Sequence, residues 1–291
     1  MLLRWIVNNY LRDAAEEKVR AAMTDVLDSR LRPAVSATDG AATDDEFLPC
    51  DVAFIFALGI ESGGLVDLLK ETETTRHKHG VEHAGVLDGR QVVIVEAGVG
   101  ADDAARATNA AIEFYRPRWV VSAGFAGALD DRLKRGGVLL ADEVANPAGN
   151  SLAVGIKLDP AVVAATKGLF VGRLLTVDRL IRTPDQRREL AERHHALACD
   201  METFAVAEAC RAADTRLLSV RIISDAVEDV LPPEIENLLS QRTLAAKVGA
   251  AAGAVLKRFS AAKDLWNLRE DALKMSDRLA RFLRGVLGQL P

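Results

Sequence analysis

The stretch that decides the fold is Gln91-Val-Val-Ile-Val-Glu-Ala-Gly-Val-Gly-Ala-Asp-Asp-Ala-Ala-Arg-Ala-Thr-Asn-Ala-Ala-Ile-Glu-Phe-Tyr115. It starts as an apolar run, turns at Gly98-x-Gly100 and continues with helical spacing. The apolar run is rich in Val and Ile on both faces, as a strand covered on two sides requires. The stretch therefore predicts a strand, a tight turn and a helix, the repeating unit of layered α/β proteins.

Similar units surround this stretch. Strands are predicted at Val52–Leu58, Gln91–Ala97, Trp119–Ala123, Gly137–Val144, Leu169–Val177 and Leu217–Ser224. Helices are predicted between several of them, at Ala101–Tyr115, Pro184–His195 and Met201–Ala213. This alternation predicts an α/β layered sheet over about residues 48–258.

The two ends of the chain follow other patterns. Residues 1–33 predict an amphipathic helix, and residues 34–50, which are mostly small, polar and acidic, predict a flexible linker before a domain at 51–258. In residues 259–291 a heptad pattern predicts a second amphipathic helix, with apolar residues at Leu265, Leu268, Ala272, Met275, Leu279, Phe282 and Val286. We expect this helix to pack against the N-terminal one, within one chain or across a dimer, with a membrane surface as the alternative.

The composition excludes several classes of partner. The 291 residues include 37 basic and 42 acidic ones, and a net charge of −5 argues against nucleic acid. Three cysteines without Cys-x-x-Cys spacing argue against a disulfide framework or a cysteine zinc site. No apolar stretch approaches the roughly 20 residues that span a bilayer. We therefore expect a cytoplasmic protein, with peripheral membrane contact through the terminal helices as the alternative.

Two patterns suggest a cofactor, and each has a simpler explanation. The Gly98-x-Gly100 turn is similar to the start of a dinucleotide fingerprint, but Asp103 stands in place of the third glycine. Asp102 and Asp103 would repel a pyrophosphate, so a nicotinamide-dependent oxidoreductase is a remote alternative. A polar stretch contains three histidines, His77, His79 and His83. They could ligate a metal, but a solvated loop is favoured. We expect neither a metal nor an organic cofactor.

Three carboxylates lie beside predicted elements, at the kind of position where α/β sheets bind ligands. Glu61 follows the first strand, Glu202 lies in the first turn of a helix, and Asp225 ends the last strand. A carboxylate beside an apolar floor can have a raised pKa and act as a base or acid. Each of the three can also be a simple helix or strand cap, so residue type alone leaves both interpretations open.

Six segments, taken in order, resemble those of the nucleoside phosphorylase and nucleosidase superfamily, most of all its methylthioadenosine/S-adenosylhomocysteine nucleosidase branch. They are Ala57-Leu-Gly-Ile-Glu61, Ala97-Gly-Val-Gly100, Ala123-Gly-Phe-Ala-Gly127, Gly136-Gly-Val-Leu-Leu-Ala-Asp-Glu143, Asp200-Met-Glu-Thr203 and Arg221-Ile-Ile-Ser-Asp225. The match covers about residues 51–258, and the order makes it specific although no single motif is. The resemblance implies a three-layer αβα sandwich around a mixed, largely parallel sheet.

The resemblance also implies hydrolysis of the N-ribosidic bond of a purine nucleoside, with adenine favoured and a substituent at the 5′ position. Glu61 would take a proton from the attacking water, and Glu202 would hold a ribose hydroxyl. Asp225 would protonate the departing base at N7. Further substrate-binding positions implied by the resemblance are Gly98, Ala123, Gly124, Phe125, Leu180, Ile181, Met201 and Ser224.

The sequence departs from the nucleosidase branch at three places. Phe125 replaces a small serine, and Leu180 stands where an aromatic ring usually contacts the base. The segment 144–156 is short and contains no aromatic residue. These departures leave the 5′ substituent open. A larger apolar group, such as the hopane of adenosylhopane, is therefore an alternative.

Water and phosphate are the alternative nucleophiles. A phosphorylase must hold a dianion, for which arginine is well suited, and residues 51–75 contain no arginine. Glu61, Asp102 and Asp103 would repel the dianion. Hydrolysis is therefore favoured, with phosphorolysis as the alternative and a non-catalytic nucleoside-binding protein as a remote one. Because family members are commonly dimers or larger, we also expect self-association.

Overall fold

The computed structural model of the chain describes residues 49–77, 80–154, 163, 166–231 and 259–290. The predicted N-terminal helix at 1–33 and nearly all of the linker lie outside these residues, as do residues 232–258. The described residues belong to one compact unit, Phe47–Pro291. The division of the chain at 51 and 258 stays a prediction.

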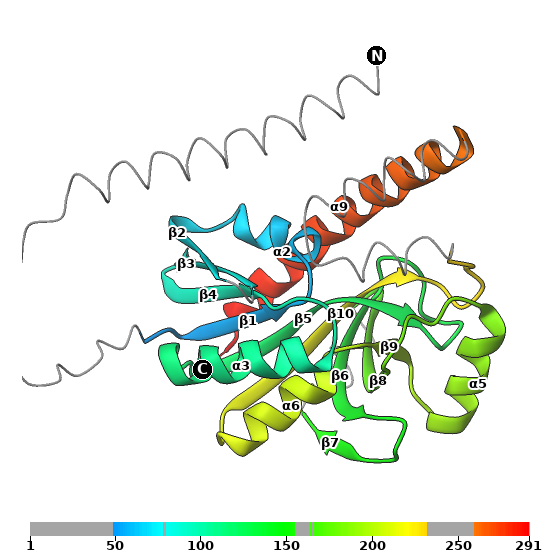
Figure 1. The fold of residues 1–291 in the computed structure, drawn as a ribbon, viewed down its shortest axis with the longest axis horizontal. Helices are drawn as coiled ribbons and strands as arrows, with labels where there is room; N and C mark the ends of the chain where they lie inside the picture. Colours follow the sequence, from blue (N-terminus) through cyan, green and yellow to red (C-terminus); the bar gives the residue numbers. More distant parts are fainter. Residues whose placement is uncertain (1–48, 78–79, 155–162, 164–165, 232–258, 291) are drawn as a thin grey trace, which may run out of the picture. The chain divides into compact units, whose positions relative to one another are not determined.

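The described elements alternate between strands and helices in the way the sequence predicts. In chain order they are β1 (Val52–Phe56), α2 (Gly59–Val66), β2 (Lys70–His77), β3 (Gly80–Leu87), β4 (Arg90–Glu96), α3 (Ala101–Tyr115), β5 (Trp119–Ala128), β6 (Val138–Ala145), β7 (Ser151–Ala153), β8 (Leu169–Thr176), α5 (Pro184–His194), β9 (Ala198–Asp200), α6 (Thr203–Ala212), β10 (Arg216–Asp225) and α9 (Phe259–Leu287). The strands form a single sheet, shown in Figure 1 between its helices.

The sheet is mixed, as the resemblance implied. Its centre is parallel, because β1 pairs with β4 and β5, and β5 pairs with β10. Antiparallel pairing joins β2, β3 and β4 on one side, and β10 and β6 on the other. Since the four central strands run the same way, the segments that follow their carboxyl ends meet at one edge. The candidate site lies at that edge.

Two layers of helices cover the sheet, which completes the three-layer sandwich. Along β1, Ala53 and Ile55 point to the layer of α3 and α6, while Phe54 and Phe56 point to the layer of α2 and α9. This alternation follows from the two-residue period of a strand. It explains why both faces of the predicted strand are apolar.

The predicted solvated loop around the histidines is wrong. His77 ends β2 and His83 lies within β3, so this stretch forms a hairpin that pairs with β4. His83 lies 2.9 Å through Nδ1 from Thr74 Oγ1 and 3.3 Å through Nε2 from Glu96 Oε1. Among the residues the structure describes, no group of three or more His, Cys, Asp or Glu side chains is placed to hold a metal.

The C-terminal helix forms as predicted, but its partner differs from the expected one. Four residues of the heptad pattern, Met275, Leu279, Phe282 and Val286, pack into the core on the side of α2. The described part of the pattern is therefore used within the chain and is not free for a second copy or a membrane. Self-association itself stays a prediction. No described helix is long and apolar enough to cross a membrane.

Candidate active site

Glu61 lies in the first turn of α2, and its side chain folds back over the start of that helix. Oε2 accepts hydrogen bonds from the N–H groups of Ala57 (3.1 Å) and Leu58 (2.9 Å), and Oε1 accepts one from Phe125 (2.8 Å). Burial raises the pKa of Glu61, while the Phe125 amide and the charge of Arg221 oppose that rise. The result is a carboxyl group held between the ends of β1 and β5, with the raised proton affinity that a base needs.

Gly124 lets the carboxylate of Glu61 come this close to β5. A Cβ atom at Gly124 would lie 2.8 Å from Glu61 Oε1 and 3.2 Å from Arg221 Nη1. Any other residue would have to displace one of these two groups. The glycine is therefore required by the site and not only by the turn of the chain.

Glu202 occupies the N-cap position of α6 and is half-buried at the site. Its Oε1 accepts a hydrogen bond from the N–H of Gly100 (2.8 Å), and its Oε2 accepts one from Met201 (3.2 Å). Burial raises the pKa of Glu202 to about 8, with help from the negative charges of Asp200 and Glu61. Near neutral pH this group can therefore either donate or accept a hydrogen bond.

Arg221 is a functional candidate to which the sequence reasoning gave no role. It lies in β10, only 3% exposed, and donates from Nε (3.1 Å) and Nη2 (2.8 Å) to Asp200 Oδ2. Nη2 also donates to Ser122 Oγ (2.9 Å), whereas Nη1 has no hydrogen-bond partner in the described structure. An arginine inside an apolar strand was the available signal, because a buried charge must be paired or used.

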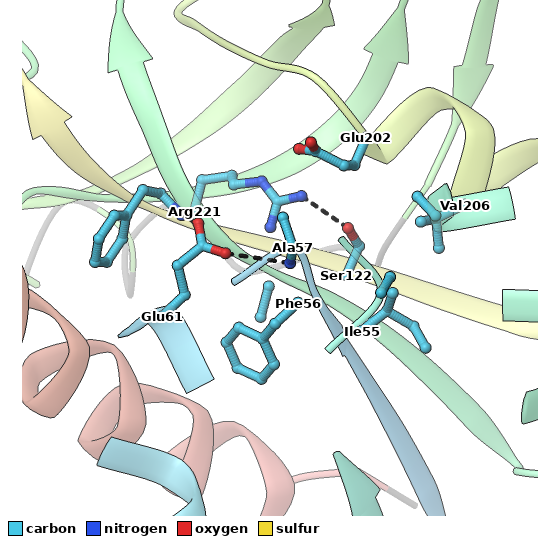
Figure 2. A pocket seen from close by; sticks show the side chains of 12 residues that line it. Ile55, Phe56, Ala57, Glu61, Ser122, Glu202, Val206 and Arg221 are labelled. Carbon is cyan, nitrogen blue, oxygen red and sulfur yellow. Dashed lines mark hydrogen bonds between the residues drawn. The ribbon is translucent and has the colours of Figure 1, made fainter. Parts of the chain in front are cut away.

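Glu61, Glu202 and Arg221 line one pocket. Figure 2 shows the guanidinium of Arg221 between the two carboxyl groups. The other lining residues come from the central strands, the segment after β4, α3 and α6: Ile55, Phe56, Ala57, Ala97, Ala104, Ser122, Ala123, Phe125 and Val206. The empty space, with the open mouth included, is about 260 Å³. The pocket thus combines mostly small or apolar walls with two acids and one cation.

Asp225 is not among the residues that line this pocket. It follows a β-bulge in β10 and lies against Gly127, where a Cβ atom would be 2.8 Å from Oδ2. Its Oδ1 accepts a hydrogen bond from Ser224 Oγ (2.5 Å). Burial raises the pKa of Asp225, and the nearby charge of Arg187 opposes that rise. Bulges beside active sites commonly redirect a side chain in this way.

Arg187, on α5, holds Asp225 in place and is fully buried. Its Nη2 lies 2.5 Å from Asp225 Oδ2 and donates to the carbonyl oxygen of Ile181 (3.1 Å), while Nη1 donates to that of Ala226 (2.8 Å). Arg187 therefore joins the end of β10 to the segment expected to bind the base. The sequence did not single it out, because α5 is charged all around and resembles a solvated helix.

The other expected substrate-binding residues fall into three groups. Ala123 and Phe125 line the pocket. Met201 packs against the cluster that contains Ile181, and Leu180 is half-buried. Gly98 is not among the lining residues, and a Cβ atom there would lie 2.9 Å from Asp103 Oδ2. Ala123 and Phe125 thus belong to the pocket, whereas Met201 and Ile181 belong to a separate apolar cluster.

Comparison with known proteins places the chain in a family. A family model described as the phosphorylase superfamily matches residues 51–260, and the chain belongs to that superfamily. The 5′-methylthioadenosine/S-adenosylhomocysteine nucleosidase of Staphylococcus aureus strain JH9 is 27% identical over 201 residues, which are 60% of this chain and 88% of that protein.

Solved structures share the fold. The S-adenosylhomocysteine nucleosidase of Streptococcus pyogenes, in complex with 5-methylthiotubericidin, matches with a TM-score of 0.62 at 19% identity, covering 84% of this chain and 98% of that one. The futalosine hydrolase of Helicobacter pylori strain 26695 matches with a TM-score of 0.60 at 16% identity, covering 82% and 97%. At such identities the likeness confirms the expected three-layer architecture.

Proposed function

We propose that this chain is a nucleosidase that hydrolyses the N-ribosidic bond of a 5′-substituted purine nucleoside, with adenine as the base. The observation that supports this most is the pocket in which the buried Glu61 and the half-buried Glu202 flank Arg221, whose Nη1 has no hydrogen-bond partner among the described residues. The Staphylococcus aureus nucleosidase described above supports the same class of reaction.

On the sugar side, the reaction adds water to the anomeric carbon as the bond to the base breaks. Glu61 accepts the proton that this water loses, and Arg221 Nη1 donates a hydrogen bond to the water oxygen. Glu202 binds a ribose hydroxyl, and Met201 packs under the ribose. The carboxyl groups stabilise the positive charge that develops on the sugar in an oxocarbenium-like transition state.

On the base side, the departing purine gains negative charge and needs a proton. Asp225, oriented by Ser224, hydrogen-bonds through a proton to N7 of the base, and Leu180 and Ile181 contact its edge. Arg187 lies beside Asp225 with its positive charge excluded from water. This cation stabilises the negative charge that the base side gains as the bond breaks.

Water fits the pocket better than phosphate. Arg221 is the cation of the pocket, and its charge is already balanced by the buried ion pair with Asp200 at 2.8 Å. A phosphate dianion would therefore meet the carboxylate of Glu61 without a spare cation, among the described residues that line the pocket, to offset the repulsion. Neutral water has no such cost.

A nucleoside panel tests the proposal. We expect methylthioadenosine or a related 5′-substituted adenosine to release adenine at the same rate with and without phosphate, with a free sugar as the second product. Formation of a sugar 1-phosphate only when phosphate is present would show phosphorolysis. Saturable binding without release of base would show a binding protein, and the proposed hydrolysis would be wrong.

A second candidate is a nucleosidase for a lipid-linked nucleoside such as adenosylhopane. The segment after β6 supports it, because this segment turns back within a few residues through a 3.0 Å bond from Asn146 N–H to Asn150 O. It leads into the short strand β7 and contributes no aromatic residue. We expect a nucleoside with a long alkyl chain at the 5′ position to be cleaved faster than methylthioadenosine if this candidate is right.

A further inference from the structure

The C-terminal helix α9 lies beyond the part of the chain that the family model matches, which ends at residue 260. It nevertheless packs into the same core as the strands that form the site. Leu279, Leu283 and Leu287 are buried beside Phe54 and Phe56 of β1. The helix is therefore an integral part of the folded unit and not an appended arm.

Ser276 of α9 forms hydrogen bonds to α2, the helix that carries Glu61. Ser276 is 1% exposed, and its hydroxyl donates a hydrogen bond to the carbonyl oxygen of Glu61 (3.1 Å). The hydroxyl oxygen of Ser276 in turn accepts a hydrogen bond from the N–H of Gly64 (3.0 Å). A single hydroxyl on α9 thus satisfies a donor and an acceptor on α2.

The two helix backbones touch at this point. A Cβ atom at Gly64 would lie 2.9 Å from both the carbonyl carbon and the oxygen of Ser276. Only glycine lets α9 come close enough for the serine hydroxyl to reach the backbone of Glu61. The close approach and the hydrogen bonds are independent observations of the same contact.

Helix α2 needs such external support. It has eight residues, and three of them, Gly59, Gly63 and Gly64, are glycines, which disfavour helix. A helix of this length is unstable alone and depends on tertiary contacts. The carboxyl group of Glu61 is held from the side of the pocket by Phe125, and its carbonyl is held from the opposite side by Ser276.

Polar contacts fix the position of α9 along its axis. Arg284 makes a double hydrogen bond to Asp88, from Nε at 2.6 Å and from Nη2 at 2.7 Å. The carbonyl oxygen of Leu290 accepts a hydrogen bond from Arg90 Nη2 at 2.5 Å. Both partners belong to the β3–β4 hairpin, so the helix cannot slide without breaking these bonds.

We propose that α9 is a positioning element for the hydrolytic base, and that Ser276 is the positioning residue through which it holds Glu61. The role in catalysis rests on the proposed function. Displacement of a reacting group by about 1 Å can reduce turnover about 100-fold. Ser276→Ala is therefore expected to lower kcat about 10- to 100-fold, with little change in KM because Glu202 and Asp225 do not contact Ser276.

The experiment compares Ser276→Ala with Leu287→Ala in the full chain. Leu287 is buried in the same cluster about three helical turns further along, but it has no bond to α2. Hydrogen exchange of residues 59–66 is measured first, because the Gly64 N–H itself reports the contact. We expect faster exchange there in Ser276→Ala than in Leu287→Ala at equal global stability. This readout needs no activity, so it separates failure of the contact from failure of the proposed function.

Turnover is then measured on folded protein. We expect kcat to fall in Ser276→Ala and not in Leu287→Ala. We also expect the limb of the pH–rate profile that reports the ionisation of Glu61 to shift in Ser276→Ala only. Ser276→Cys, which keeps the size and a weak donor, should be intermediate, and it replaces the alanine variant if that one does not fold. Equal exchange in both variants, or equal kcat in an active parent and Ser276→Ala, would overturn the proposal.

Discussion

Replacement of Asp225 is expected to affect activity and stability together, because the carboxylate is the charged partner of a buried arginine. Arg187 is fully buried, and its Nη2 lies 2.5 Å from Asp225 Oδ2. Asp225→Ala would leave the guanidinium with only backbone carbonyl oxygens, those of Ile181, Ala226 and residue 225 itself, as hydrogen-bond partners among the described residues. Breaking such a pair from one side costs about 3–5 kcal/mol. That is a large part of a total stability of roughly 5–15 kcal/mol.

Asp225→Asn keeps an oxygen for Arg187 and loses only the charge, so we expect a smaller loss of about 1–3 kcal/mol. The rate of base release by Asp225→Asn should still fall about 10²–10⁴-fold, because this is the usual contribution of one acid–base group. Urea unfolding followed by circular dichroism gives the stability. Release of adenine, measured at a temperature where the variant is folded, gives the activity.

The double variant Arg187→Met/Asp225→Asn separates the two effects. Removing both charges should restore part of the stability lost in Asp225→Asn, because the uncompensated buried charge is gone. It should restore no activity. A double variant less stable than both single ones would refute the buried ion pair, and near-normal turnover by Asp225→Asn would refute the role of Asp225 at the base.

Three further substitutions test the pocket. Glu61→Gln should lower kcat about 10²–10⁴-fold while nucleoside binding, measured by calorimetry, persists. Gly124→Ala places a Cβ atom 2.8 Å from Glu61 Oε1 at a position with a φ of +155°, and should lower both kcat and thermal stability. For Glu202 the pKa of about 8 exceeds the ordinary 4.5, so folding takes up a proton and the free energy of unfolding falls as pH rises between these values. Glu202→Gln should flatten that slope in urea midpoints measured at several pH values; an unchanged slope would contradict the raised pKa.

The central strands could be predicted because they are buried on both sides. In β1 and β4 every residue from Val52 to Phe56 and from Val92 to Val95 is buried, so the sequence shows an unbroken apolar run. The hairpin β2–β3 escaped prediction for the opposite reason. Lys70–His77 is exposed along its whole length at the sheet edge, and nothing in its polar residues distinguishes a strand from a loop.

Sequence patterns do not predict which partner a given side chain contacts, because that depends on tertiary structure. The position of Glu61 after a buried strand predicted a carboxylate at the sheet edge, and the structure places it there. Nothing in α5 indicated that Arg187, rather than neighbouring Arg188, turns inward to Asp225. Likewise, a heptad pattern predicts an apolar stripe on α9 but does not say whether α2, a second copy or a membrane covers it.

Strand β10 contributes to two buried ion pairs, one in each half of the proposed site, and it supplies the cation in one pair and the anion in the other. At Arg221 the strand supplies the cation and Asp200 the anion, in a pocket that also contains Glu61 and Glu202. At Asp225 the strand supplies the anion and Arg187 the cation. Two carboxyl groups therefore lie where the sugar would become positive, and the buried guanidinium of Arg187 lies beside the proposed acid where the base would become negative. Fixed charges of this kind lower the barrier for breaking the ribosidic bond because they do not have to reorient as the charge separates.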